Sequence, residues 1–171
     1  MKKSLVINTI VIMTALTGCA TTSKTTTDQQ HVAKMQVAPV KLILTQKYQN
    51  DTFYDESTLA KKMTACIQDE LSKTGKFSTN STDPKLTLSV DYKRTYSGEA
   101  FGMNKTIGDV RFGYDYQITQ NNQVLQQNSA KDRIAHQGLI TIFTMGLGNS
   151  AQASEDKFIV GVCQDIIETI K

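Results

Sequence analysis

The residues from Lys85 to Tyr96 alternate apolar and polar side chains more regularly than any other stretch of the chain. Leu86, Leu88, Val90 and Tyr92 share one parity, and threonine, serine, aspartate and lysine fill the positions between them. Successive side chains of a strand point to opposite faces of its sheet, so this pattern predicts a strand with one face in a core and the other in water.

Three further segments extend this sheet. Residues 109–120 repeat the alternation with Val110, Phe112, Tyr114, Tyr116 and Ile118. Asn121-Asn122 predicts a hairpin turn, because asparagine tolerates positive φ. The segment 123–135 is more polar and suits an edge strand. A shorter alternation at 40–48, after Pro39, predicts the first strand.

Two segments carry apolar residues at helical spacing. The first is 58–74, with Asp55 or Ser57 as its cap and Gly75 at its end, and its stripe is Leu59, Met63, Cys66, Ile67 and Leu71. The second begins near Ser154, with Glu155 and Asp156 in its first turn, and its apolar face is Phe158, Ile159, Val162, Cys163, Ile166 and Ile170. The order β-α-β-β-β-α predicts an α+β fold, in which both helices pack on one face of an antiparallel sheet of about four strands.

The first 19 residues predict where the protein resides. Lys2 and Lys3 precede an apolar run from Leu5 to Leu16, which ends in Leu16-Thr17-Gly18-Cys19. The run is too short to cross a bilayer as a helix, which needs about 20 apolar residues. A positive start, a short apolar core and small residues are typical of an export signal.

This segment resembles the bacterial lipoprotein signal with its lipobox, in which an aliphatic residue and two small residues precede a cysteine. The resemblance implies that the Cys19 thiol receives a diacylglyceryl group, that the chain is cut between Gly18 and Cys19, and that the new amine is acylated. Several acyl chains would hold the protein firmly to a membrane, whereas a single chain anchors only marginally. A conventional secretory signal with an incidental cysteine is the alternative.

The mature chain divides into a tether and a single domain. Residues 1–18 form the signal, and residues 19–34 form a lipidated cysteine and a polar segment that is too poor in apolar side chains to pack. Residues 35–171 suffice for one periplasmic α+β domain. The formal net charge of the whole chain is +3, and part of it comes from Lys2 and Lys3. This charge does not favour a nucleic-acid partner.

Catalytic, metal-binding and cofactor-binding motifs are weak in this sequence. His136 is the only histidine in the predicted domain, and nothing in the spacing pairs it with a nucleophile. Asp91 and Asp115 could share the outer face of the sheet as a carboxylate pair, but a solvated polar face explains them more simply. Tyr92, Tyr96, Tyr114 and Tyr116 could form a binding platform, although the parity of Tyr92, Tyr114 and Tyr116 favours the core. We therefore expect no enzyme, no metal and no cofactor.

Cys66 and Cys163 lie on the apolar stripes of the two predicted helices. Two cysteines in an exported domain could form a disulfide, which would close a long loop. Two buried free thiols are the alternative.

Residues 138–148 combine glycine with large apolar side chains and carry no charge. Flanking glycines do not favour an ordinary helix. We weigh a buried strand against an apolar loop that contacts a partner or the membrane surface. The apolar residues of this segment are Leu139, Ile140, Ile142, Phe143, Met145 and Leu147.

The order of elements and the anchor together resemble small outer-membrane assembly lipoproteins, such as those of lipopolysaccharide transport, curli export and exopolysaccharide export. The resemblance implies an outer-membrane lipoprotein that faces the periplasm and binds a protein or envelope component in assembly, transport or maintenance. Ala20 after the cysteine, in place of aspartate, favours the outer membrane. The alternatives are an enzyme that acts on peptidoglycan or glycans, and a carrier of a small ligand or lipid.

Overall fold

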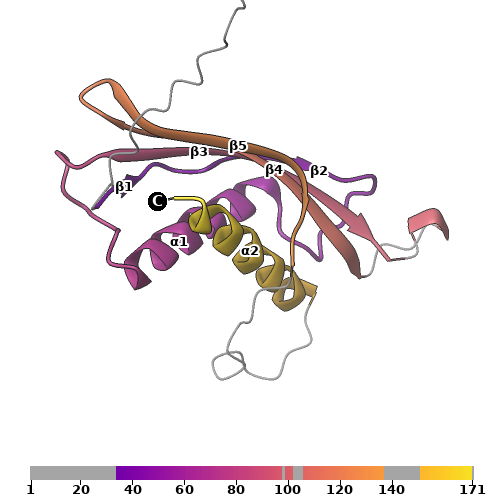
Figure 1. Ribbon diagram of the computed structural model, residues 1–171. Helices are drawn as coiled ribbons and strands as arrows, with labels where there is room; N and C mark the ends of the chain where they lie inside the picture. Colours follow the sequence, from indigo (N-terminus) through magenta and orange to yellow (C-terminus); the bar gives the residue numbers. More distant parts are fainter. Residues whose placement is uncertain (1–33, 98, 102–105, 137–150, 171) are drawn as a thin grey trace, which may run out of the picture.

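The computed structural model describes residues 34–97, 99–101, 106–136 and 151–170. Both long helices lie on the same side of one twisted sheet (Figure 1). The elements, in chain order, are β1 (Gln36–Val37), β2 (Lys41–Thr45), α1 (Glu56–Lys73), β3 (Lys85–Tyr96), the 3-10 helix η1 (Glu99–Phe101), β4 (Ile107–Gln120), β5 (Gln123–Ile134) and α2 (Ala151–Glu168).

The sheet is mixed rather than purely antiparallel. β3 pairs antiparallel with β4, and β4 pairs antiparallel with β5. The short strands β1 and β2 both run parallel to β3, with Gln36 opposite Lys85 and Lys41 opposite Ser89. The predicted α+β fold is confirmed, but the expected antiparallel pairing of the first strand is wrong. α1 carries the chain across the sheet, and such a crossover lets the next strand start in the same direction.

The parity of the strand residues places the core as predicted. Leu86, Leu88, Val90 and Tyr92 are buried, and so are the inward residues of β4. Tyr114 and Tyr116 are also buried, which confirms them as core residues, and the structure adds Tyr96 to the core. From the helices, the core receives Leu59, Met63, Ile67, Leu71, Phe158, Ile159, Val162, Cys163 and Ile166.

The predicted turn and cap residues adopt the expected conformations. Asn121 and Asn122 have φ values of 51° and 64°, which suit a tight hairpin between β4 and β5. The Asp55 side chain accepts a hydrogen bond of 2.6 Å from the Thr58 N–H and caps α1. Gly75 has a φ of 70° just after the helix, a conformation that favours glycine.

Hydrogen bonds from the sheet hold the C-terminal end of α2. The Tyr116 hydroxyl and the Gln126 amide both donate to the Thr169 carbonyl, at 3.0 and 3.1 Å. The Lys76 ammonium donates to the Ile170 carbonyl at 3.1 Å. Carbonyls at a helix end lack partners within the helix, so these donors fix α2 in place.

Side chains of α1 protect the free edge of β2. The Thr64 hydroxyl oxygen accepts from the Val40 N–H, and the Glu56 carboxylate accepts from the Leu44 N–H, both at 2.9 Å. Donors that are already occupied make this edge a poor template for an added strand.

Candidate functional site

None of the described helices or strands covers the face of the sheet that points away from α1 and α2 (Figure 1). On β3 the residues Thr87, Ser89, Asp91 and Lys93 are exposed, in alternation with the buried core residues. We call this surface the outer face. Its residues are Lys41, Ile43 and Thr45 of β2, Thr87, Ser89, Asp91 and Lys93 of β3, Arg111, Gly113, Asp115 and Gln117 of β4, and Lys131 and Asp132 of β5.

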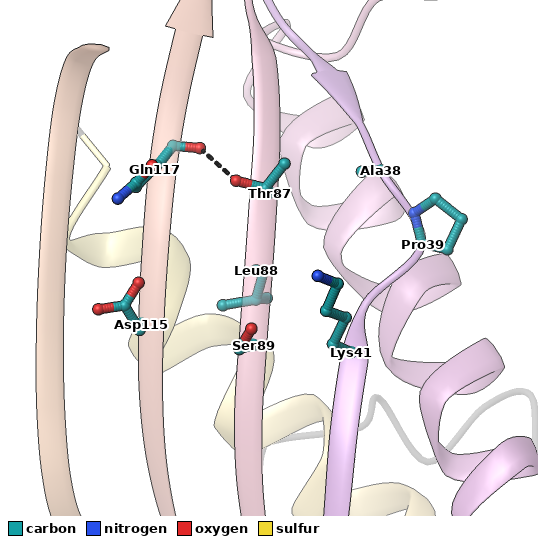
Figure 2. A pocket seen from close by; sticks show the side chains of 8 residues that line it. All are labelled: Ala38, Pro39, Lys41, Thr87, Leu88, Ser89, Asp115 and Gln117. Atoms are coloured by element: carbon teal, nitrogen blue, oxygen red, sulfur yellow. Dashed lines mark hydrogen bonds between the residues drawn. The ribbon is translucent and has the colours of Figure 1, made fainter.

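A row of three polar side chains crosses the outer face. Ser89 lies opposite Lys41 of β2 on one side and opposite Asp115 of β4 on the other. These residues line a hollow of about 320 Å³, whose rim includes Pro39 and Gln117 (Figure 2). Lys41, Ser89 and Asp115 form no side-chain hydrogen bond or ion pair with another described residue. The row can thus offer an ammonium, a hydroxyl and a carboxylate to a ligand.

Asp91 and Asp115 both lie on the outer face, as the sequence suggested, but they do not oppose each other. Asp91 faces Gly113 across β3 and β4, whereas Asp115 faces Ser89. Both side chains are exposed. The two carboxylates therefore do not form a directly opposed pair across β3 and β4.

A second hollow of about 310 Å³ adjoins the first along β3 and β4. Lys93 and Arg111 oppose each other across these strands, and Lys131 of β5 also lines the hollow. The Arg111 guanidinium donates to both carboxylate oxygens of Asp132, at 3.1 and 3.2 Å. Asp91 completes the charged lining, which holds three cations and two carboxylates.

A bulge in β5 shapes this hollow. The register between β4 and β5 shifts between Phe112 and Tyr114, and Asp132 within the bulge has a φ of 51°. At Gly113 a Cβ atom would lie only 3.2 Å from the Ala130 carbonyl oxygen. Glycine at 113 therefore allows the bulged strand to approach β4 closely. Bulges of this kind often redirect side chains at functional sites.

A buried ion pair joins β3 to α2 on the inner side of the sheet. The Arg94 Nε donates to the Glu155 carboxylate at 2.9 Å, and both side chains are fully buried. Arg94 also donates to the Gln46 side-chain oxygen and to the Tyr54 carbonyl, each at 2.8 Å. The Tyr54 N–H donates to Glu155 at 3.0 Å. This network fixes the segment before α1 against the start of α2.

The sequence interpretation missed this pair, although a signal was available. Arg94 shares its parity with Tyr92 and Tyr96, so the alternation itself places a charge in the core. Such a charge requires a buried partner. Glu155 was expected in the first turn of a helix from about Ser154. In the structure α2 begins at Ala151, and Glu155 lies three and four residues before Phe158 and Ile159, on the buried face of this helix.

Burial alters the titration of Glu155 and of Tyr92, which lies two residues before Arg94 on β3. It raises the pKa of the Glu155 carboxyl, and the attraction of Arg94, which acts in the opposite direction, is the smaller effect. Burial also raises the pKa of Tyr92 well above its ordinary value. The Tyr92 hydroxyl is buried and forms no hydrogen bond within the described residues.

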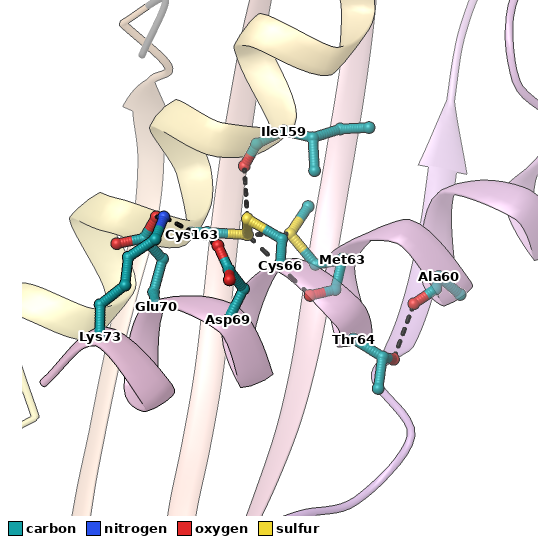
Figure 3. Close-up of a disulfide and its surroundings, with 9 residues drawn as sticks. All are labelled: Ala60, Met63, Thr64, Cys66, Asp69, Glu70, Lys73, Ile159 and Cys163. Atoms are coloured by element: carbon teal, nitrogen blue, oxygen red, sulfur yellow. Dashed lines mark hydrogen bonds and ion pairs between the residues drawn. A yellow bond between two sulfur atoms is a disulfide. The ribbon is translucent and has the colours of Figure 1, made fainter. Parts of the chain in front are cut away.

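Cys66 of α1 and Cys163 of α2 are joined as a disulfide, with a Cα–Cα distance of 6.3 Å (Figure 3). This distance lies within the usual range for such a bond. Cys163 is buried and Cys66 is half-buried. The bond connects the two helices across their contact and lies on the opposite side of the sheet from the outer face.

The other predicted site residues take part in none of the arrangements described above. Gly18, Cys19 and the apolar segment of Leu139, Ile140, Ile142, Phe143, Met145 and Leu147 lie outside the described residues, and their roles stay predictions. His136 is exposed just after β5. The described residues contain no group of histidine, cysteine or carboxylate side chains that could hold a metal ion. None of the described helices is long and apolar enough to cross a membrane.

Comparison with known proteins identifies no family for this chain. No protein-family model matches it, and no curated protein does. A minor lipoprotein from Acinetobacter baumannii is 15% identical over 81% of this chain and 93% of its own, with a TM-score of 0.40. A Xanthomonas campestris protein of family DUF330 is 10% identical over 82% of this chain and 85% of its own, with a TM-score of 0.44. These similarities are too low to transfer a function.

Proposed function

We propose that this protein is a lipid-anchored lipoprotein of the outer membrane, that it faces the periplasm, and that its outer face binds a protein or another envelope component without catalysing a reaction. The observation that carries the binding proposal is the pair of adjoining hollows on the outer face. From Thr87 to Lys93 they follow β3 for about 20 Å, given a rise of about 3.3 Å per residue.

Apart from the Arg111–Asp132 pair, several charges on the outer face lack the ion pairs that are found on the helical side of the sheet. There, Lys62 pairs with Asp156 at 3.0 Å, Arg133 pairs with Asp165 at 2.6 Å, and Arg94 pairs with Glu155. On the outer face Lys41, Lys93 and Asp115 form no ion pair with a described residue. Charges without an internal partner are available to a ligand at little cost, because no existing pair has to be broken.

Lipid anchoring at Cys19 gives the first test. Cys19→Ser removes the thiol that would form the thioether, so we expect cells to incorporate no labelled fatty acid into this variant and to leave its signal uncut at Gly18. Metabolic labelling and gel mobility measure both effects. If the wild-type protein carries no label, or if the variant is still cut after Gly18, the lipoprotein assignment fails.

Contact through the outer face gives the second test. A photo-crosslinking amino acid at Ser89 lies in the middle of the polar row, and the same amino acid at Ala65 lies on an exposed position of α1. We expect irradiation of intact cells to produce a defined crosslinked species from position 89 and none from position 65. Crosslinks from position 65 alone would show that the partner binds the helical side and would contradict the proposal.

A further inference from the structure

We propose that the hollow between β3, β4 and β5 on the outer face binds a phosphate group, through Lys93, Arg111 and Lys131. The inference rests on the proposed function, because it takes the outer face as the binding surface. It adds that a phosphate group is the part of the ligand that binds in this hollow. Four features of the hollow support it.

The first feature is an unfavourable arrangement of charge. Lys93 and Arg111 stand directly opposite each other on antiparallel strands. Directly opposed side chains on one face have Cβ atoms about 5 Å apart, and like charges there destabilise a sheet. Asp132 already balances Arg111 in part, and an anion between the two cations would offset the repulsion that remains.

The second feature is the shape of the site. Gly113 carries no side chain at the floor of the hollow, and its volume is about 310 Å³. Lys131 approaches from β5, where the bulge places its Cα 3.6 Å from the position that a Cβ of residue 113 would take. Three cations from three strands thus surround one open space.

The third feature is the fixed position of Arg111. Asp132 accepts two hydrogen bonds from its guanidinium, and Asp109 lies 3.8 Å from its Nε. A guanidinium that is already oriented loses less freedom on binding an anion than a free side chain does. The two lysines have no such partner among the described residues.

The fourth feature is the balance of charge. Asp132 pairs with Arg111, so these two charges offset each other, and Lys93 and Lys131 together outweigh Asp91 by one positive charge. Lysines act as point charges toward phosphate, which bears more negative charge than a carboxylate and so gains more from several cations. The net positive lining therefore favours phosphate over a carboxylate ligand.

Phosphate titration of the full-length protein in nonionic detergent tests the inference, with the Gly113 amide resonance as the reporter. We expect saturable binding of inorganic phosphate at constant ionic strength. Lys93→Gln should weaken it about tenfold, since a hydrogen bond to a charged group contributes about 1.5 kcal/mol or more. Asp91→Asn should strengthen it. Lys85→Gln is the matched control, since Lys85 lies on the same strand and face opposite Thr119.

Thermal melting in chloride, without phosphate, supplies a second readout. Lys93→Gln should melt above the wild type because the repulsion from Arg111 is removed, and Lys85→Gln should not. Phosphate also stabilises proteins in general by exclusion from their surface, and that effect would be equal in all variants. Equal affinity and equal melting in the wild type, Lys93→Gln and Asp91→Asn would overturn the inference.

Two soluble probes distinguish the possible sources of the phosphate. Inorganic phosphate represents a free or terminal phosphate group, and glycerophosphoglycerol represents a lipid headgroup without its acyl chains. Binding of both probes indicates that a headgroup fits, and binding of inorganic phosphate alone indicates a terminal phosphate. If neither probe binds, the phosphate site is overturned. Crosslinking from position 89 would still support the proposed function in that case.

Discussion

Replacing Arg94 by methionine should destabilise the domain by about 3–5 kcal/mol, because it leaves the Glu155 carboxylate buried without its cation. The loss has further components, since the Gln46 side chain and the Tyr54 carbonyl also lose a donor. Urea unfolding at neutral pH measures the change. A loss below about 1 kcal/mol would mean that Glu155 reaches water and that the ion pair is not part of the core.

A double variant separates the charge from the packing. Arg94→Met combined with Glu155→Leu removes both charges, and such replacements are often neutral or stabilising. Here the recovery should be partial, because the Tyr54 N–H and carbonyl both lose their partners. If the double variant is less stable than Arg94→Met alone, the buried carboxylate was not the source of the loss.

The loss of stability caused by Arg94→Met should become smaller as the pH falls. Burial already raises the pKa of Glu155, and removal of Arg94 eliminates the attraction that lowers it. The folded variant then binds a proton more tightly than the unfolded chain does, so its stability rises as the pH drops from the folded pKa toward the ordinary value of 4.5. Unfolding curves of the wild type and of Arg94→Met across this pH range should show that the difference between their stabilities becomes smaller.

Loss of the Cys66–Cys163 disulfide should be the second large effect. The two cysteines are 97 residues apart, and closing a loop of this length contributes up to about 4.7 kcal/mol in the chain-entropy model, with about 2–4 kcal/mol typical. We expect Cys66→Ala to lower the free energy of unfolding by about 2–4 kcal/mol. Cys66 is the better position to change, because Cys163 is fully buried and its truncation would add a cavity.

A reducing agent provides the control for the disulfide. It should lower the stability of the wild type to about that of Cys66→Ala and leave the variant unchanged. Thiol counting on the denatured, unreduced protein should find neither Cys66 nor Cys163 free. Two free thiols, together with a wild type that does not respond to the reducing agent, would show that the cysteines pack as small apolar groups instead.

The helices, strands and turns of this protein follow from local residue patterns that can be recognised in the sequence alone. The alternation predicts β3 with the bounds that the structure has, Lys85 to Tyr96, because its side chains alternate with the period of a strand. Asn121 and Asn122 marked the hairpin, and Asp55 and Gly75 marked the limits of α1, because these residues suit conformations that few others adopt. The anchor at Cys19 is predicted on a different basis, the resemblance of the first 19 residues to a bacterial lipoprotein signal.

Tertiary structure decided what depends on contacts between distant residues. The parallel pairing of β2 with β3 follows from the path of α1 over the sheet, which no local pattern encodes. Arg94 meets Glu155 across 61 positions, and Lys93 meets Arg111 only through the register of two strands. The sequence could mark Lys93, Arg111 and Lys131 as polar residues of a solvated face. The register of the strands and the bulge in β5 place these three residues around a single hollow, because register and bulge determine which side chains are neighbours.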